Sequence, residues 1–347
     1  MENLPPNITF EILSRLPVES LVQCKQVCKT WRTLLLRKTD TKVGLLFSFG
    51  LNGETGNKVQ LGYGVLRRTV DDEISIDHRQ SYKKLTWVDH PSIDKRDGFD
   101  AIVGSCNGLV CFSIPHDRID EPVYICNPTT KEYTHLPTLD WTEIPTFNEI
   151  SYRSLSGLYI PESTLNRKRG RTVNGFGYHP STNEYKVVRI YYNELYYAEP
   201  HTPGRVQVYT LGHGSGWRVI GMITHKLHSS SGILANGALH WMDYTNLKIV
   251  AFDLADEKFR LLPSPPCFRL DKPASAFKLQ VLGGYLSVVH QEPGDRVDIW
   301  SFKENSNSEA KEQDQYQSWS WSSGFSIPWE GGLEEDSYKP FALAGRN

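Results

Sequence analysis

The sequence lacks any long apolar run, and its positive and negative charges nearly balance. No uninterrupted apolar stretch approaches the roughly 20 residues of a membrane-spanning helix, and Met1 to Pro5 show neither the basic start nor the apolar run of a secretory signal. With 38 basic and 40 acidic residues, no overall field draws the chain to nucleic acid or to an anionic membrane. We therefore expect a protein of the cytoplasm, the nucleus or both, with neither a membrane nor a nucleic acid as its partner.

Cysteine is also scarce, which excludes a disulfide scaffold. The chain has six cysteines in 347 residues, and none stands at C-x-x-C spacing. Cys24 and Cys28 are one helical turn apart, but two ligands without a nearby histidine pair make a poor metal site. We expect reduced thiols, most of them buried as small apolar groups, and no bound metal. The cysteines are Cys24, Cys28, Cys106, Cys111, Cys126 and Cys267.

The usual signatures of catalysis are missing as well. There is no G-x-x-x-x-G-K-[ST] loop, and the G-x-G sequences at Gly62 and Gly175 lack the third glycine and the following helix of a nucleotide site. Neither H-E-x-x-H nor a nucleophile elbow occurs. A metal cluster of His225, His228 and His240 is conceivable through space, although scattered histidines are more often structural. We expect no catalytic residue and no cofactor.

What the sequence does have is a helical period, confined to residues 4–36. Proline is tolerated in a first helical turn and fits a start at Leu4-Pro5-Pro6, and Pro17 breaks the run. Two apolar stripes result, and some 35 residues cannot bury both alone. Part of this surface is therefore expected to meet a partner or the protein's own sheet. The stripes are Ile8, Ile12, Leu13 and Leu16, then Leu21, Cys24, Val27, Cys28, Trp31, Leu34 and Leu35.

Beyond Thr41 the helical period disappears, and short apolar or alternating runs recur between Gly, Pro, Asn and Asp residues. Such strands without intervening helices favour an all-β sandwich, a barrel or a propeller. The clearest predicted strands are 42–49, 108–114, 186–192, 206–211, 248–254, 280–290 and 297–302.

Internal repetition narrows the choice to a propeller. Each repeat consists of an Asn-Gly turn, an apolar strand, a second strand ending in Asn or Asp, and a short strand ending in Leu-Pro. The clear copies run from Asn107 to Pro137 and from Asn236 to Pro263, and weaker ones begin at Asn174-Gly175 and Gly283-Gly284. One unit cannot hide its own apolar face, so several must stack. The roughly 300 residues after Thr41, at about 45 to 50 per blade, predict six or seven blades of a kelch-like propeller.

The N-terminal residues strongly resemble an F-box, through L-P-P-N-I-x-x-E-I-L-S-R-L-P-V-E-S-L and then V-C-K-x-W-R. The F-box is the motif that docks on the Skp-family adaptor of cullin-RING ubiquitin ligases. The resemblance implies that ten apolar residues contact this adaptor or form the motif's own small core. They are Leu4, Pro5, Ile8, Ile12, Leu13, Leu16, Pro17, Leu21, Val27 and Trp31.

The repeats resemble the F-box-associated interaction domain of plants, through G-S-C-N-G-L-V-C-F, C-N-P-T-T-K-E-Y, G-F-G-Y-H-P-S-T-N-E-Y-K-V-V and N-G-A-L-H-W. We therefore expect a mainly β protein with a small all-α N-terminal module. An F-box should occupy residues 1–40 and a propeller-like substrate-recognition domain residues 41–347. The chain stops soon after residues 318–328, where relatives continue, so the last blade is expected to be incomplete.

These resemblances imply a non-catalytic substrate receptor of an SCF-type (Skp-cullin-F-box) ubiquitin ligase. Its partners would be a Skp-family adaptor, cullin through that adaptor, and an unidentified protein substrate. One alternative is a propeller oxidoreductase or lyase with a helical leader. Another is a protein that binds the adaptor and recruits no substrate. The basic cluster at residues 166–171 can serve as a nuclear address or touch an acidic substrate, but it fits a solvated loop better.

Overall fold

The computed structural model describes the parts of the chain that carry its regular elements. These are residues 5–14, 30–31, 44–53, 56–65, 86–88, 102–116, 119–128, 132–138, 170–192, 203–269, 271–272, 274–292, 296–304 and 319–328. The chain divides into two compact units. One holds residues 1–101, 108–110 and 125–134, and the other holds residues 102–107, 111–124 and 135–347.

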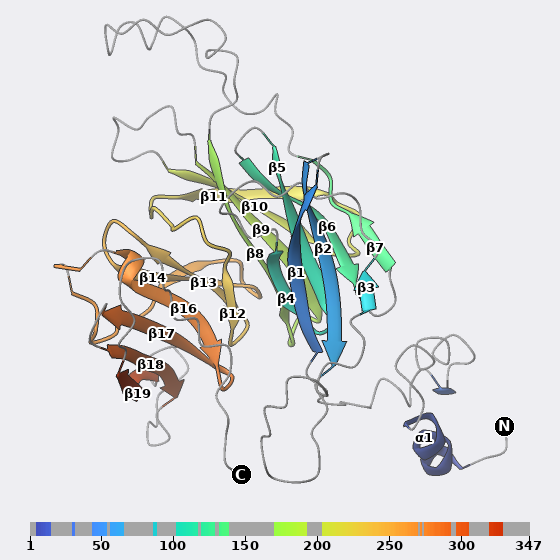
Figure 1. The fold of residues 1–347 in the computed structure, drawn as a ribbon. Helices are drawn as coiled ribbons and strands as arrows, with labels where there is room; N and C mark the ends of the chain where they lie inside the picture. The colour runs from blue at the N-terminus through green and yellow to red at the C-terminus, as the bar shows by residue number, and fades with distance from the viewer. Residues whose placement is uncertain are drawn as a thin grey trace, which may run out of the picture. The chain divides into compact units, whose positions relative to one another are not determined.

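The described residues of the first unit include the short helix α1 and a three-stranded sheet (Figure 1). Helix α1, Pro6–Ser14, begins directly after Pro5, whose carbonyl oxygen accepts a hydrogen bond of 3.0 Å from the Thr9 N–H. This confirms the predicted helical start. The strands β1 (Gly44–Gly53), β2 (Gly56–Val65) and β3 (Thr86–Val88) follow in the order β1-β2-β3, with antiparallel pairing throughout.

Four further sheets have four strands each, and every sheet runs through its strands in sequence order. This meander confirms a mainly β architecture. The first sheet holds β4 (Ile102–Cys106), β5 (Leu109–His116), β6 (Ile119–Asn127) and β7 (Glu132–His135). The second holds β8 (Arg171–His179), β9 (Glu184–Tyr192), β10 (Gly204–Thr210) and β11 (Trp217–Ile223).

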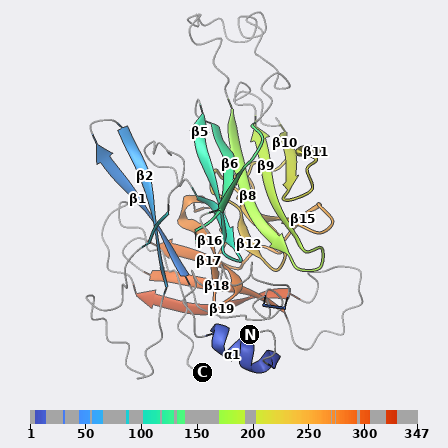
Figure 2. The same ribbon diagram turned by 90° about the vertical axis from the view of Figure 1, so that its right-hand side faces the viewer.

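The last two sheets repeat the pattern. One holds β12 (Ile233–Ala235), β13 (Ala238–Asp243), β14 (Lys248–Asp253) and β15 (Phe259–Leu261). After the short 3-10 helix η3 (Ala274–Ala276) come β16 (Phe277–Leu282), β17 (Tyr285–Glu292), β18 (Arg296–Glu304) and β19 (Trp319–Pro328). Figures 1 and 2 draw β16 to β19 in this order across one sheet. This sheet has four strands, and the expectation of an incomplete last blade stays a prediction.

Tight turns join the first two strands of three sheets, as the repeats predicted. Asn107-Gly108 has φ angles of 48° and 81°, Asn236-Gly237 has 50° and 74°, and Gly283-Gly284 has 58° and 82°. Two successive positive φ angles are the requirement of the two-residue hairpin turn that Asn and Gly satisfy best. The turn predicted at Asn174-Gly175 is wrong, because both residues lie inside β8, although a four-stranded repeat does begin in this region.

Gly175 has a packing role in place of a turn. A Cβ on this residue would lie 2.8 Å from side-chain atoms of Leu239 and of Trp241 on the neighbouring sheet. The space beside Gly177 is similarly filled, because an added Cβ would lie 2.7 and 2.8 Å from side-chain atoms of Leu234 and Leu254. Glycine here allows the β8 backbone to approach the next sheet, a role that sequence reasoning confused with turn formation.

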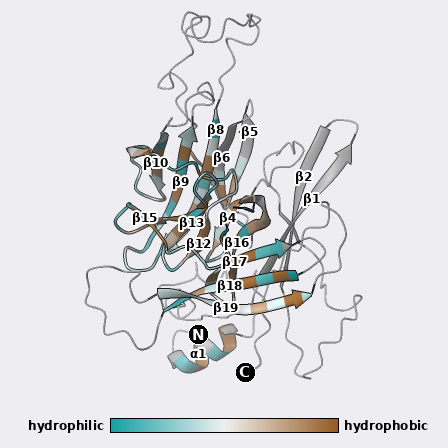
Figure 3. Cartoon of the chain, turned by 90° about the vertical axis from the view of Figure 1, so that its left-hand side faces the viewer, coloured by the Kyte–Doolittle hydropathy of each residue, from teal (hydrophilic) through white to brown (hydrophobic). Residues whose placement is uncertain are grey.

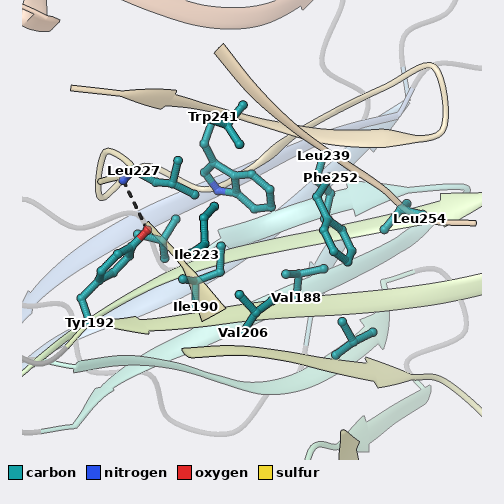
Figure 4. Close-up of a cluster of buried hydrophobic side chains, with 13 residues drawn as sticks. Val188, Ile190, Tyr192, Val206, Ile223, Leu227, Leu239, Trp241, Phe252 and Leu254 are labelled. Carbon is teal, nitrogen blue, oxygen red and sulfur yellow. Dashed lines mark hydrogen bonds between the residues drawn. The ribbon is translucent and has the colours of Figure 1, made fainter. Parts of the chain in front are cut away.

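The sheet β12–β15 is apolar on both faces, which explains why several sheets must pack together. Along β13 and β14, alternate residues point to opposite faces: Leu239, Trp241, Val250 and Phe252 enter one cluster with β8–β11 residues, shown in Figure 4. Residues of the opposite face join a second cluster with β16–β18 residues. The second cluster includes Ala238, Met242, Ile249, Ala251, Phe277, Leu286, Val288 and Phe302.

The first strands of successive sheets contact one another: β4 with β8, β8 with β12, and β12 with β16. In a propeller the first strand of each blade lies innermost, so these contacts have the pattern of adjacent blades. The predicted total of six or seven blades stays a prediction.

Indole hydrogen bonds connect the outer strands of neighbouring sheets in the same way at two places. Leu262 is buried directly after β15, the last strand of the third sheet. The carbonyl oxygen of the next residue, Pro263, accepts a hydrogen bond of 2.6 Å from Trp321 Nε1 of β19. The first sheet has an equivalent Leu-Pro sequence after its last strand. There the Pro137 carbonyl oxygen accepts a hydrogen bond of 2.7 Å from Trp217 Nε1 of β11. The Leu-Pro segments that follow the last strand of a sheet therefore connect that sheet to the next one, a role that their local sequence did not predict.

An ionic cluster joins the second and third sheets. Lys186 of β9 is only 4% exposed, and its Nζ lies 2.9 Å from Glu257 Oε1 and 2.7 Å from the Leu254 carbonyl oxygen. Arg218 of β11 reaches the same carboxylate at 2.7 Å. Burial by itself raises the pKa of Glu257, but hydrogen bonds from Arg218 and Lys186 outweigh that effect and hold the pKa below its ordinary value.

The substitution Trp321→Phe tests the indole connection. It keeps an aromatic ring against Phe302 but removes the donor to Pro263, so the free energy of unfolding should fall by about 1 to 2 kcal/mol in urea denaturation. Trp319→Phe is the matched control, because Trp319 packs on the same Phe302 ring and its indole donates no hydrogen bond among the described residues. Equal losses in the two variants would contradict the connection.

Acidification tests the ionic cluster. Because the folded pKa of Glu257 lies below its ordinary value of 4.5, its contribution to stability is present above about pH 4.5 and is lost as the pH falls through the folded pKa. Glu257→Gln should lower the unfolding free energy near pH 7 by about 1 to 3 kcal/mol and flatten its decline below pH 5. Arg218→Gln should flatten the same curve. A Glu257→Gln curve parallel to that of the wild type would refute this account.

Candidate functional site

Helix α1 has one buried face and one exposed face. Thr9 and Leu13, four residues apart, are buried at 6% and 2% exposure, whereas Ile8 and Ile12 are 43% and 45% exposed. Residues at i and i+4 lie on the same side of a helix, so each pair forms one face. Figure 3 shows hydrophobic and hydrophilic segments side by side on this helix.

This arrangement corrects the sequence-based grouping of Leu13 with Ile8 and Ile12. One residue advances a helix by about 100°, which places Leu13 on the buried face while Ile12 stays on the exposed one. Sequence analysis also missed the burial of Thr9, because a threonine gives no apolar signal. We name the exposed pair Ile8 and Ile12 the α1 stripe.

The remaining predicted adaptor residues are described only in part. Pro5 is exposed immediately before α1, and Trp31 lies in helical backbone and is partly exposed. The other five lie outside the described residues: Leu4, Leu16, Pro17, Leu21 and Val27. Cys24 and Cys28 lie outside them too.

A second candidate site lies where β8 begins and where β9 and β13 end. The guanidinium carbon of Arg171 lies 4.3 Å from the ring centroid of Tyr192 and 5.7 Å from that of Tyr244, distances at which a cation is attracted to an aromatic face. Its Nη1 donates a hydrogen bond of 2.8 Å to the Leu227 carbonyl oxygen. We name Arg171, Tyr192 and Tyr244 the Arg171 platform.

Hydrogen bonds fix the inner ring of this platform. The Tyr192 hydroxyl donates to the His225 carbonyl oxygen at 2.7 Å and accepts from the Leu227 N–H at 3.4 Å, the contact drawn in Figure 4. Burial raises the pKa of Tyr192 to about 12, so the hydroxyl stays protonated at neutral pH and keeps donating. Tyr244, in contrast, is 43% exposed.

The carboxylate of Asp243 beside the platform is fully buried and already satisfied. Its Oδ2 lies 2.8 Å from His225 Nδ1 and accepts from Asn246 Nδ2 at 3.1 Å. Its Oδ1 accepts the backbone N–H groups of Thr245 at 2.9 Å and Asn246 at 3.3 Å. These contacts are those of an Asx turn after β13, so Asp243 shapes the chain rather than binding a partner.

The histidines considered as metal ligands have separate environments. His240 is buried in β13 with Nδ1 3.1 Å from the Ile233 carbonyl oxygen, and burial lowers its pKa to about 4. His225 pairs with Asp243, and His228 accepts the Ser230 N–H. Within the described ranges no three His, Cys, Asp or Glu side chains gather as metal ligands.

The described thiols are poor nucleophiles. Burial raises the pKa of Cys106 to about 12, of Cys126 to about 11 and of Cys267 to about 12, so these thiols stay protonated at neutral pH. Cys111 is completely buried, and none of the four described cysteines forms a disulfide. That these cysteines stay reduced remains a prediction.

Comparison with known proteins identifies the family. Residues 73–321, well over half of the chain, match the model of the F-box associated beta propeller domain. The chain belongs to this family. Residues 1–39, which include the α1 stripe, match the F-box-like model.

Similar proteins come from Arabidopsis thaliana and carry the F-box name. F-box protein At3g07870 is 28% identical over 87% of this chain and 70% of its own length. F-box/kelch-repeat protein At3g23880 is 27% identical over 87% of the chain and 76% of its own length. F-box protein CPR1 is 27% identical over 88% of the chain and 70% of its own length.

In the part of the chain that the structure describes, no helix has both the length and the apolar character needed to cross a membrane.

Proposed function

We propose that this F-box protein is the substrate-recognition subunit of an SCF-type ubiquitin ligase. In this role it binds a Skp-family adaptor through its N-terminal module and a target protein through its β domain. It performs no chemistry itself. Holding a target close to a ubiquitin-charged enzyme raises the effective concentration of the reacting groups, which accelerates transfer without a catalytic residue on this chain.

The α1 stripe is the observation that carries this proposal. Two isoleucines one helical turn apart stand exposed on a helix within the F-box-like match. Covering such a side chain is worth about 1.5 to 3 kcal/mol, and anchors read at i and i+4 are typical of a helix that lies in a partner's apolar groove. The stripe is therefore suited to a protein partner such as the Skp-family adaptor.

The β domain supports the second half of the proposal. Its sheets bury their apolar faces against each other and are joined by indole and ionic contacts, so they form a rigid base for turns and strand ends. Binding residues are commonly placed on loops held by such a base.

The double substitution Ile8→Asp and Ile12→Asp tests adaptor binding. Removing two apolar anchors costs about 3 to 6 kcal/mol of binding free energy, so affinity for a purified Skp-family adaptor should fall at least about a hundredfold in calorimetry. Both side chains are exposed, so the fold should survive, which circular dichroism will check. Leu13 is unsuitable for this test because its burial makes any loss of binding ambiguous.

Asn7→Asp is the control, since Asn7 is exposed on the same helix and also gains a negative charge without losing an apolar group. Undiminished adaptor binding by the folded double variant would contradict the assignment of the α1 stripe as an adaptor contact. Recovery of cullin with the wild type, together with a target that accumulates when the chain is removed, separates a substrate receptor from a protein that only occupies the adaptor.

A further inference from the structure

The Arg171 platform holds its cation against two tyrosine rings. Within the described part of the chain no carboxylate pairs with Arg171, whose contacts are the Leu227 carbonyl oxygen and the rings of Tyr192 and Tyr244. The side chain is partly exposed. Arginine has five N–H donors in a planar fork, so this geometry leaves donors for an external acceptor.

The segment beside Arg171 carries one further cation. Residues 225–228, whose Leu227 carbonyl oxygen accepts the Arg171 hydrogen bond, include Lys226, while both oxygens of Asp243 are occupied by His225 and its own turn. Burial lowers the pKa of His228, and the charge of Arg171 lowers it further, so this imidazole is neutral near pH 7 and leaves the guanidinium as the charged donor of the platform.

We infer that the Arg171 platform binds a carboxylate side chain in an acidic segment of the target protein. This inference rests on the proposed role as a substrate receptor. A guanidinium held by a tyrosine ring and by the Leu227 carbonyl oxygen is restricted in its movement. Its remaining donors form a planar fork that matches a carboxylate. The exposed Tyr244 ring adds apolar area next to the charged contact, an amphipathic surface typical of protein interfaces.

A carboxylate fits the site better than a nucleic acid. Nucleic acids are held by many cations that follow the phosphate backbone, whereas the platform presents one fixed guanidinium on a chain whose net charge is -2. The basic residues that precede Arg171 in the sequence extend the positive charge by only a few positions. Arg171, the last residue of the basic cluster 166–171, begins β8, and residues 166–169 lie outside the described residues.

Peptide selectivity of the full-length wild type gives the first test. Fluorescence anisotropy compares a labelled peptide rich in Asp and Glu with the same peptide in which every acid is changed to its amide, and with a single-stranded oligonucleotide of similar charge. The acidic peptide should bind at least about tenfold tighter than the amide peptide, and more weakly as salt increases. Equal binding of the two peptides, or tighter binding of the oligonucleotide, would overturn the inference.

Variants locate the site. Arg171→Gln should weaken acidic-peptide binding at least about tenfold, the loss expected for one charge-assisted pair, and Arg171→Lys should recover part of it because it keeps the charge but not the fork. Lys258→Gln is the matched control: it removes an equal charge from an exposed residue at the turn between β14 and β15. A tenfold loss in Lys258→Gln equal to that in Arg171→Gln would contradict the assignment to Arg171.

Adaptor binding separates this inference from the proposed function. Arg171→Gln should bind the Skp-family adaptor as the wild type does, because Arg171 lies outside the F-box-like residues 1–39. If the wild type binds the adaptor but does not distinguish the two peptides, only the acidic-target inference fails. If the wild type does not bind the adaptor, the proposed function fails, whatever the peptides do.

Discussion

The fold depends on the need of a β sheet with two apolar faces to cover both of them. In β12–β15, alternate residues of the same strands pack into different clusters, so this sheet has a core on each side. A single sheet exposed to water on either face would lose about 25 cal/mol for each Å² of apolar surface left uncovered. Neighbouring sheets are therefore part of the folding unit, and the repeat of the sequence is a repeat of packing as well as of strands.

Contacts between the sheets add orientation to this apolar packing. Apolar side chains attract without much directional preference. The indole of Trp321 instead donates to one carbonyl oxygen, and Lys186 contacts the Glu257 carboxylate of the next sheet. Gly175 sets how closely β8 approaches its neighbour. The packed sheets hold strand ends, including those that carry the Arg171 platform, in fixed positions. By contrast, the α1 stripe leaves apolar surface exposed on the helix, which is why the two candidate sites suggest different kinds of partner.

Local patterns predicted the features that depend on neighbours in sequence. Asn107-Gly108 and Asn236-Gly237 form the turns expected of them, because positive φ is a property of these residue types. Asn174-Gly175 has the same two residues inside a strand, since there the approach of Leu239 and Trp241 decides the role of the glycine. Likewise, a helical period places Ile8, Ile12 and Leu13 near one another but does not say which of them a distant segment will cover.

By itself the sequence determined the mainly β character, the strand-turn repeat, the helical start at α1 and the F-box family, since each is written in short residue patterns. Only the tertiary structure decided that Ile8 and Ile12 stay exposed while Leu13 is buried. Only the tertiary structure showed that the Leu-Pro segments accept indole hydrogen bonds and that the Arg171 guanidinium lies near the rings of Tyr192 and Tyr244. These outcomes join residues far apart in the chain, and their distances follow from how the sheets pack rather than from any local propensity.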